Sequence, residues 1–293
     1  MRVLQYFLAV AREQSISAAA QSLHLSQPTL STQLKAMEHE LGKQLLIRGT
    51  KGSRKVTLTE EGMILRKRAE EILQLVKKAE DEVAQSDETV AGNVFIGAGE
   101  TDGVRYLIKA QRALQRKYPL IYFHIQSGDR KDILESLDRG LSDFGLILGD
   151  VDTSKYDDLT IPNQDTWGVL MRRDSPLADK EVIEPEDLWD QPLILSRQEC
   201  LEGVLLPWLK KERGQIHKVA TYSLLFNGSL MVEEGLGYAV CLDKIINTSG
   251  DSKLCFRPLF PKMEMKMHVI WKKYQVFSKA ADQYLQQLRE FSS

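Results

Sequence analysis

The spacing of hydrophobic positions over the first forty residues predicts three helices. The first covers about residues 3–14 and has its apolar side chains on one face: Leu4, Phe7, Leu8 and Ala11. We expect a folded helix there rather than a secretory leader, because the apolar run is short and charged residues follow it. A short second helix begins at Ser15 or Ser17 and ends near residue 23, since a serine hydroxyl can accept hydrogen bonds from the free N–H groups of a first turn.

A third, longer helix follows a break at residues 24–26. Ser26 is a suitable cap for its start, and Pro28 lies in its first turn, where a missing N–H group costs nothing. Gly42 ends this helix, as glycine commonly does just beyond a last turn. A short helix, a tight turn and a longer helix with polar residues at its start form a helix-turn-helix arrangement. Residues 45–58 then predict two short strands around a glycine-rich basic tip, which together form a wing.

A single long helix is predicted from about residue 59 to residue 85. Its apolar positions alternate steps of four and three, which is a heptad stripe: Leu65, Ala69, Ile72, Val76, Ala79 and Val83. Such a helix can pack on its own domain or pair with the same helix of a second copy. We favour pairing, because the stripe is narrow and flanked by Lys and Glu.

The remaining residues have an α/β pattern in two parts. The first part has strands at 94–96, 121–125 and 144–148 and helices at 104–117 and 133–139. The second part has strands at 167–171, 193–195, near 219 and 238–242, and helices at 204–211 and 224–234. Strands that alternate with helices predict parallel sheets with right-handed crossovers.

The last strand, at 267–271, and the last helix, at 278–291, fit either sheet. If they return to the first, the chain crosses between the parts twice and forms a hinged cleft, a common ligand site. We therefore expect three domains at 1–58, 59–88 and 89–293, the last split into subdomain I (89–161 and 268–293) and subdomain II (162–267).

Composition excludes several classes of protein. The 293 residues are 43% hydrophobic and 27% charged, which suits a globular chain, and no run approaches the roughly 18 apolar residues of a membrane span. Cys200, Cys241 and Cys255 are odd in number and widely spaced, so neither a disulfide framework nor a zinc site is expected. We expect no cofactor, no enzymatic constellation and a reducing cytoplasmic location.

The net charge of −2 hides an uneven distribution. Residues 1–58 carry eight Lys or Arg and three Glu, a net charge of +5, so the rest of the chain carries −7. A basic end on an acidic body indicates a module that binds a polyanion, joined to a body with another task.

The exposed side of the third helix carries side chains suited to DNA: Gln27, Thr29, Ser31, Thr32 and Lys35. Glutamine pairs with adenine edges, serine and threonine bond to bases or phosphates, and lysine supplies positive charge. At the wing, Arg48, Lys51 and Arg54 would neutralise backbone phosphates. The alternative is a small helical bundle with a solvated polar face; the local charge, the wing and the long helix favour duplex DNA.

The N-terminal part also contains a long and specific set of strings: Ser15-Ile16-Ser17-Ala18-Ala19-Ala20, Leu23, Ser26-Gln27-Pro28, Ser31, Gln33-Leu34, Met37-Glu38, Leu41-Gly42, Leu45, Arg48 and Leu58-Thr59-Glu60-Glu61-Gly62. These strings resemble the LysR-type transcriptional regulators. The resemblance continues less specifically in three later strings: Tyr118-Pro119, Asp143-Phe144-Gly145-Leu146-Ile147 and Val232-Glu233-Glu234-Gly235-Leu236-Gly237.

The resemblance implies a winged helix-turn-helix, a dimerising linker helix and a two-subdomain effector domain like a periplasmic binding protein. Such proteins bind promoter DNA as dimers or tetramers and respond to a small co-inducer. Gln27, Pro28, Ser31, Thr32 and Lys35 match positions that typically face DNA, with Ser26 beside them. Two residues depart from the family pattern, Leu46 in place of a usual phenylalanine and Leu242 in place of a frequent proline.

The loop at 97–103 is the first candidate for the effector cleft. Its glycines are similar to the Gly-x-Gly-x-x-Gly motif of dinucleotide-binding proteins. The third glycine, however, is one position farther along the chain than in that motif, and no acidic residue ends the next strand. A ligand loop at a helix N-terminus fits better. Glu100 and Asp102 either face the ligand or cap the helix and leave Thr101 to the ligand.

Other polar groups expected at the cleft are Ser127, Ser196 and Arg197. Arg197 would compensate an anionic ligand or simply lie at the surface. Peroxide-sensing members of the family use a cysteine pair. Cys200 lies in a comparable region, but no second cysteine is near it in the sequence, and Cys241 is predicted to be a core residue. We therefore expect no thiol switch.

We therefore expect a homo-oligomeric DNA-binding regulator controlled by a small molecule of unknown identity, without a membrane partner. The alternative is a solute-binding or enzymatic α/β protein with a basic N-terminal module. Binding of promoter DNA at low salt distinguishes the two, since only the first requires it.

Substitutions can test the predicted division between residues that contact DNA bases and residues that contact DNA phosphates. Gln27→Ala should relax sequence preference, whereas Lys51→Ala should weaken all DNA about equally and lower the salt dependence of binding. Mobility shifts on matched and mismatched duplexes over a salt series measure both effects. The division is wrong if the two variants behave alike.

Overall fold

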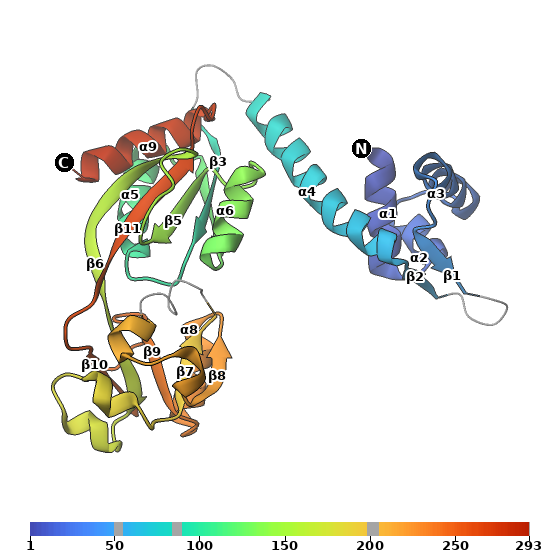
Figure 1. Cartoon of the computed structure of the whole chain (residues 1–293). Helices are drawn as coiled ribbons and strands as arrows, with labels where there is room; N and C mark the ends of the chain where they lie inside the picture. Colours follow the sequence, from blue (N-terminus) through green and yellow to red (C-terminus); the bar gives the residue numbers. More distant parts are fainter. Residues whose placement is uncertain (50–54, 84–89, 198–204, 293) are drawn as a thin grey trace. The chain divides into compact units, whose positions relative to one another are not determined.

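A computed structural model describes residues 1–49, 55–83, 90–197 and 205–292. The chain divides into two compact units, residues 1–84 and 85–293, each with its own hydrophobic core (Figure 1). Among the described helices, none is both long and apolar enough to cross a membrane.

The N-terminal unit contains the three predicted helices and the wing strands. They are α1 (Arg2–Glu13), α2 (Ile16–Ser22), α3 (Gln27–Leu41), β1 (Leu46–Arg48) and β2 (Val56–Leu58), with the two strands antiparallel. The local signals act as expected: Ser15 accepts from the Ala18 N–H at 3.3 Å, and Ser26 accepts from the Thr29 N–H at 3.3 Å. Gly42 follows α3 with a left-handed φ of 64°, a conformation that costs glycine little.

Helix α4 (Glu60–Val83) begins with a tight approach to the wing. The Thr59 hydroxyl accepts from the Gly62 N–H at 3.0 Å and donates to the Gln44 carbonyl at 2.7 Å. A Cβ on Gly62 would lie 2.2 Å from the carbonyl oxygen of Leu45, so glycine is required where α4 crosses this strand entry.

The predicted stripe of α4 exists, but its two ends have different surroundings. Ala69 is fully buried and Leu65 packs against the core of the N-terminal unit, so this part of the stripe is not free to pair. Farther along, Ile72 and Val83 of the stripe are exposed in the single chain, as is Leu75 beside it. The expectation of one continuous pairing seam is therefore wrong at its start, because these positions complete the unit's own core.

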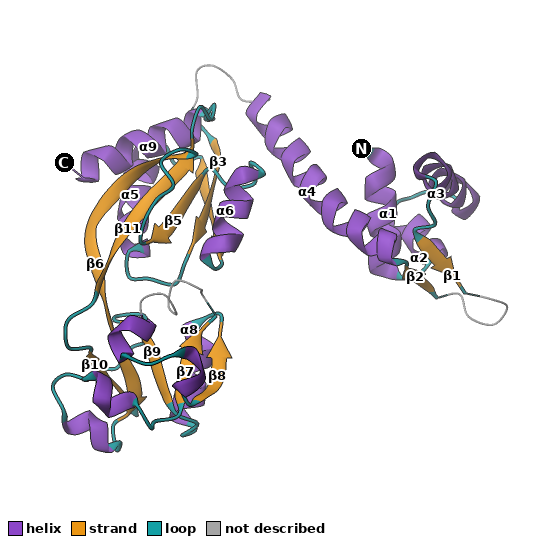
Figure 2. Cartoon of the chain, in the orientation of Figure 1, coloured by secondary structure: helices purple, strands orange, loops and turns teal. Residues whose placement is uncertain are grey.

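Subdomain I of the C-terminal unit is a sheet with helices on both faces. Its strands are β3 (Gly92–Ala98), β4 (Ile121–Ser127), β5 (Phe144–Leu148), part of β6 (Tyr156–Arg172) and β11 (Glu264–Lys272), in the order β4-β3-β5-β11-β6. Helices α5 (Val104–Lys117) and α9 (Lys279–Ser292) pack on one face, and α6 (Arg130–Asp138) packs on the other (Figure 2). The Phe144 ring lies at the centre of the larger core, 5.5 Å from the Tyr284 ring.

Subdomain II continues the same nine-stranded sheet through the second half of β6. Its strands are β7 (Leu193–Ser196), β8 (Lys218–Tyr222), β9 (Tyr238–Leu242) and β10 (Leu254–Pro258). Helix α8 (Leu225–Glu233), a helical segment at 205–209 and three short 3-10 helices, η1 (Pro176–Asp179), η2 (Pro185–Leu188) and η3 (Arg213–Gln215), complete it.

The chain crosses between the subdomains twice, through β6 and β11. Strand β11 returns to the first sheet and pairs antiparallel with both β5 and β6. The expectation of parallel sheets holds for β3, β4 and β5 and for β7, β8 and β9, but it is wrong for the two linking strands and for β10. Because β11 enters subdomain I from the opposite end, it runs antiparallel to β5.

Two strands were not predicted at their observed extent. Residues 156–166 of β6 are rich in Asp and Asn and include Pro162, residue types that are depleted in strands. Pairing with β11 supplies the ladder that holds them extended. Strand β10 was missed altogether, and it pairs with β6 from Leu254 to Pro258.

We expect Gly62→Ala to destabilise the N-terminal unit by about 1–3 kcal/mol, because the added methyl group must displace backbone rather than a flexible side chain. Hydrogen exchange of the α3 core amides in the full chain measures this local stability. Glu60→Ala, at an exposed position in the same turn, is the control and should change exchange little. Equal protection in both variants would contradict the close approach.

Candidate DNA-binding surface and effector cleft

One face of α3 is polar and exposed while the other is buried. Leu30, Leu34 and Met37 point into the core of the N-terminal unit. The predicted DNA-facing residues lie on the remaining surface, all exposed except the half-buried Ser31: Ser26, Gln27, Pro28, Thr29, Ser31, Thr32 and Lys35. The hydroxyls of Ser26 and Thr29 are 2.7 Å apart, so these two side chains also cap the helix start. The structure thus brings the predicted α3 residues together on one surface.

Arg48, predicted to contact phosphate, has a structural partner. Its Nη2 lies 3.0 Å from Oε2 of Glu38, whose side chain is 13% exposed. The other oxygen of Glu38 accepts from the N–H groups of Leu45 and Leu46 at 2.9 and 3.0 Å. Glu38 therefore ties α3 to β1, a role that sequence reasoning missed because its partners are backbone groups of another element.

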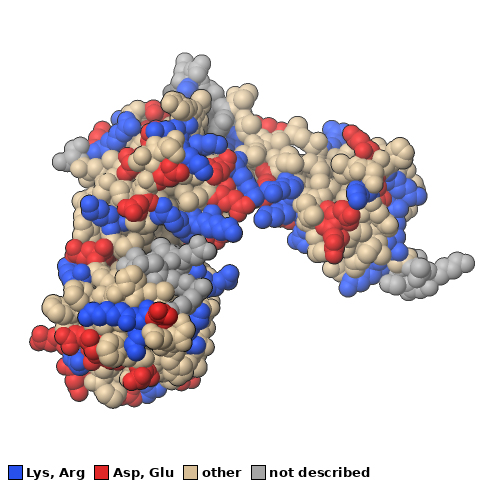
Figure 3. Space-filling view, in the orientation of Figure 1, with Lys and Arg blue, Asp and Glu red and all other residues tan. Residues whose placement is uncertain are grey.

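The other predicted wing residues, Lys51 and Arg54, lie outside the described residues. In the view of Figure 3, Lys and Arg side chains lie around the edge of the N-terminal unit, with Asp and Glu nearer its centre. This distribution leaves positive charge at the rim of the unit.

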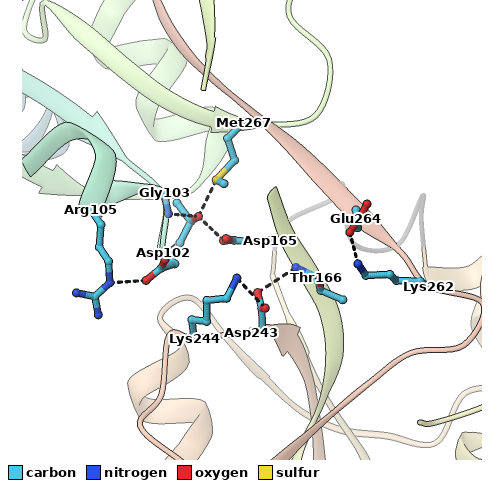
Figure 4. A network of polar contacts seen from close by, with 11 residues as sticks. Asp102, Gly103, Arg105, Asp165, Thr166, Asp243, Lys244, Lys262, Glu264 and Met267 are labelled. Atoms are coloured by element: carbon cyan, nitrogen blue, oxygen red, sulfur yellow. Dashed lines mark hydrogen bonds and ion pairs between the residues drawn. The ribbon is translucent and has the colours of Figure 1, made fainter. Parts of the chain in front are cut away.

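In the C-terminal unit, the loop after β3 holds Thr101 in a buried network. The Thr101 hydroxyl contacts the carboxylate of Asp165 and the sulfur of Met267, and it accepts from the Gly103 N–H at 3.0 Å (Figure 4). Asp102 instead pairs with Arg105 at 2.5 Å. The alternative that Glu100 and Asp102 cap α5 and leave Thr101 to a ligand is therefore wrong: no side chain caps α5, and Thr101 accepts from the N–H of Gly103, the residue before the helix.

Glu100 caps a different helix, in the other subdomain. Its carboxylate accepts a hydrogen bond from the backbone N–H of Leu225, the first residue of α8. Residue 224, before this helix, offers no side-chain cap, and no acidic residue lies in the first turn. Glu100 thus satisfies a helix N-terminus, where partial positive charge favours a carboxylate.

Asp165 is the buried charge of the linking strand β6, at 1% exposure. Burial raises the pKa of Asp165, and neighbouring Asp243 raises it further, while Thr101 and Lys244 oppose the shift. Asp243 in turn accepts from the Thr166 N–H and lies 3.0 Å from Lys244. Sequence reasoning missed Asp165 because residues 156–166 were not recognised as strand.

A small hollow of about 30 Å³ lies beside Glu100. Its walls come from the carboxyl ends of strands in both subdomains, at Leu148, Ser196, Tyr222 and Leu242, and from Trp167 in the middle of β6. Ligands of open α/β sheets bind at this edge. Two of the six predicted effector residues, Glu100 and Ser196, line the hollow.

The other predicted effector residues lie elsewhere. Thr101 is buried in its network, Asp102 pairs with Arg105, and Ser127 is exposed at the end of β4. Arg197 is exposed next to Ser196 and is not part of the wall.

The cysteines in the described residues are buried. Cys241 lines the hollow, and burial raises the pKa of its thiol, which keeps it protonated at neutral pH. Cys255 is also buried, and Cys200 lies outside the described residues. Within the described part of the chain, no group of three His, Cys, Asp or Glu is placed to hold a metal.

Comparison with known proteins covers both units. The model of the bacterial regulatory helix-turn-helix proteins of the lysR family matches residues 1–63, and the LysR substrate binding domain matches residues 87–293. The HTH-type transcriptional regulator BsdA of Bacillus subtilis is 35% identical over 70% of this chain and 69% of its own. The DNA-binding transcriptional dual regulator OxyR of Escherichia coli is 31% identical over 67% of this chain and 63% of its own.

Among solved structures, full-length CbnR complexed with its target DNA is similar at a TM-score of 0.77, with 18% identity and 99% of both chains covered. This likeness establishes the fold.

The raised pKa of Asp165 predicts a pH dependence of stability. Because the folded state holds the proton more tightly, protonation stabilises it fully below the ordinary Asp pKa of 3.8, and this stabilisation is lost as the pH rises through the folded value. As the pH rises from the ordinary Asp pKa through the raised folded-state pKa, the free energy of unfolding of the wild type should fall relative to that of Asp165→Asn. Urea titrations at several pH values measure this difference.

Asp157→Asn, an exposed change on the same strand, is the control and should track the wild type. A difference between wild type and Asp165→Asn that stays constant with pH would refute the linkage.

Proposed function

The chain belongs to the LysR family of transcriptional regulators, and from that premise we propose which of its surfaces bind DNA, effector and a second copy. It is a DNA-binding regulator rather than an enzyme, since both family models describe regulator domains. This membership sets aside the alternative of a solute-binding or enzymatic protein with an incidental basic module.

The α3 surface is proposed to read the major groove. The observation that carries this proposal is the exposed polar row of Gln27, Thr32 and Lys35 on a helix whose opposite face is fully buried. Glutamine reads adenine, threonine a base or the thymine methyl, and lysine a guanine or phosphate. The Ser26 cap and Glu38 support both ends of this helix from within the unit.

The wing is proposed to bind the DNA backbone through contacts with its phosphates. Arg48 remains a candidate, with its side chain one-third exposed while it pairs with Glu38. Lys51 and Arg54 complete the proposed anchor. These contacts supply affinity that falls with salt and carry no base information.

The effector is proposed to act at the hollow between the subdomains. Glu100 joins the two halves there through the Leu225 N–H, while β6 and β11 form the only covalent links between the halves in the described chain. A ligand that binds better to one degree of closure shifts the population toward it. The proposed domain limits are 1–58 for DNA binding, 59–88 for the linker and 89–293 for effector binding, with subdomains divided near 161 and 268.

Self-association is proposed to use the exposed end of the α4 stripe, where Ile72 and Val83 face solvent in a single chain. Burying such a stripe against its copy is the coiled-coil solution for a helix that is apolar on one side. We also propose a cytoplasmic location, where promoter DNA is accessible.

The test of the function uses full-length protein and a duplex selected by it from a random pool. Wild type should bind with an affinity that falls linearly with salt on logarithmic scales. Ile72→Lys with Val76→Lys should give monomers in sedimentation and weaken DNA binding, because paired half-sites no longer share one dimer.

Gln74→Lys adds one positive charge at an exposed position on the opposite side of α4 and should remain oligomeric. Unaltered oligomers in the double variant would place the interface elsewhere, and a wild type that retains no duplex at low salt would defeat the proposed function.

A further inference from the structure

The hollow beside Glu100 has an uncompensated negative charge. Glu100 is half-buried and lines it, and none of the described residues in its wall is Lys, Arg or His. The carboxylate meets a neutral partner, the Leu225 N–H. Two basic residues adjoin residues of the wall in the sequence. Lys244 forms an ion pair with Asp243 at 3.0 Å, and Arg197 is exposed outside the wall.

Burial without a counter-charge is costly for a carboxylate. Desolvation raises the pKa of Glu100, and the Leu225 N–H only partly opposes the shift. A second anion brought into this hollow would add like-charge repulsion in a poorly screened place, whereas a cation would supply the missing partner.

Two aromatic side chains strengthen the preference for a cation. Trp167 and Tyr222 line the same hollow and are 5% and 7% exposed. Aromatic faces attract ammonium groups, most strongly where water is excluded. In addition, the buried Nε1 of Trp167 has no hydrogen-bond partner among the described residues. A ligand with an acceptor atom would satisfy this donor.

We propose that the effector of this protein is a small organic cation, with an ammonium group held by Glu100 and a hydrogen-bond acceptor for the Trp167 N–H. The inference rests on the proposed function, which assigns effector binding to this hollow. It goes further by setting the charge of the ligand, which is opposite to that of a carboxylate effector.

The same geometry links ligand binding to the contact between subdomains. The hollow of about 30 Å³ has room for about one water molecule, so a ligand with several heavy atoms must enlarge it. An ammonium group would share the Glu100 carboxylate with the N–H of Leu225, and enlarging the hollow would draw the two sides of that hydrogen bond apart. Binding therefore weakens a contact across the cleft as it forms a contact with the ligand.

The test compares probes that have one shape and different charge. Benzylamine, benzyl alcohol and benzoate, together with butylamine and butyrate, are titrated into the full-length protein by calorimetry and thermal shift. We expect the amines to bind and raise the melting temperature, and the carboxylates to do neither. Amine binding should also speed hydrogen exchange at the start of α8.

Glu100→Gln is the diagnostic variant, because glutamine keeps the size and can still accept from Leu225 while losing the charge. Amine affinity should fall about 10- to 100-fold, the loss expected for a charge-assisted hydrogen bond. Glu181→Gln removes an exposed carboxylate outside the hollow and should bind amines like the wild type.

Binding of the carboxylates in preference to the amines, binding of neither class, or equal amine affinity in wild type and Glu100→Gln would each overturn the proposal. Mobility shifts on the same samples separate it from the proposed function. If wild type and Glu100→Gln bind DNA while amines do not bind, only the charge of the effector is wrong; if DNA binding fails, the regulator function fails independently.

Discussion

The buried hydrogen bond between Thr101 and Asp165 fixes the geometry of the effector domain. It joins the loop after β3, in subdomain I, to the strand β6 that continues into subdomain II. Because Thr101 also accepts from the N–H of Gly103, just before α5, the loop has little freedom, and the preceding Glu100 is directed to the start of α8. A polar pair buried in this way is costly unless satisfied, so it specifies one arrangement of loop, hinge and cleft.

The two units solve the same problem of placing polar groups at a surface in different ways. In the N-terminal unit, α3 divides its residues by face, with Leu30 and Leu34 in the core and Gln27 and Lys35 in solvent. Its support is local and rigid, because Glu38 holds the entry to β1 through backbone N–H groups. In the C-terminal unit, Thr101 and Glu100 depend on partners far along the chain, Asp165 on the linking strand and the Leu225 N–H in the other subdomain.

Charge separates these two tasks as well. Residues 1–58 carry a net charge of +5, and the rest of the chain carries −7. The positive end suits phosphate, whereas the described wall of the hollow holds the carboxylate of Glu100 without a basic neighbour. A cationic effector and a polyanionic target would thus be recognised by opposite ends of one chain, with little competition between them.

The sequence by itself determined the features that depend on neighbouring residues. Serine caps at Ser15 and Ser26, the glycine stop at Gly42 and the apolar spacing of α3 are local signals, and the structure confirms each. Only the tertiary structure decided the roles of Glu38, Asp165 and Glu100. Their partners lie 7 or more, 64 and 125 residues away, and a buried carboxylate has the same sequence signal as a surface one until the fold brings its partner to it.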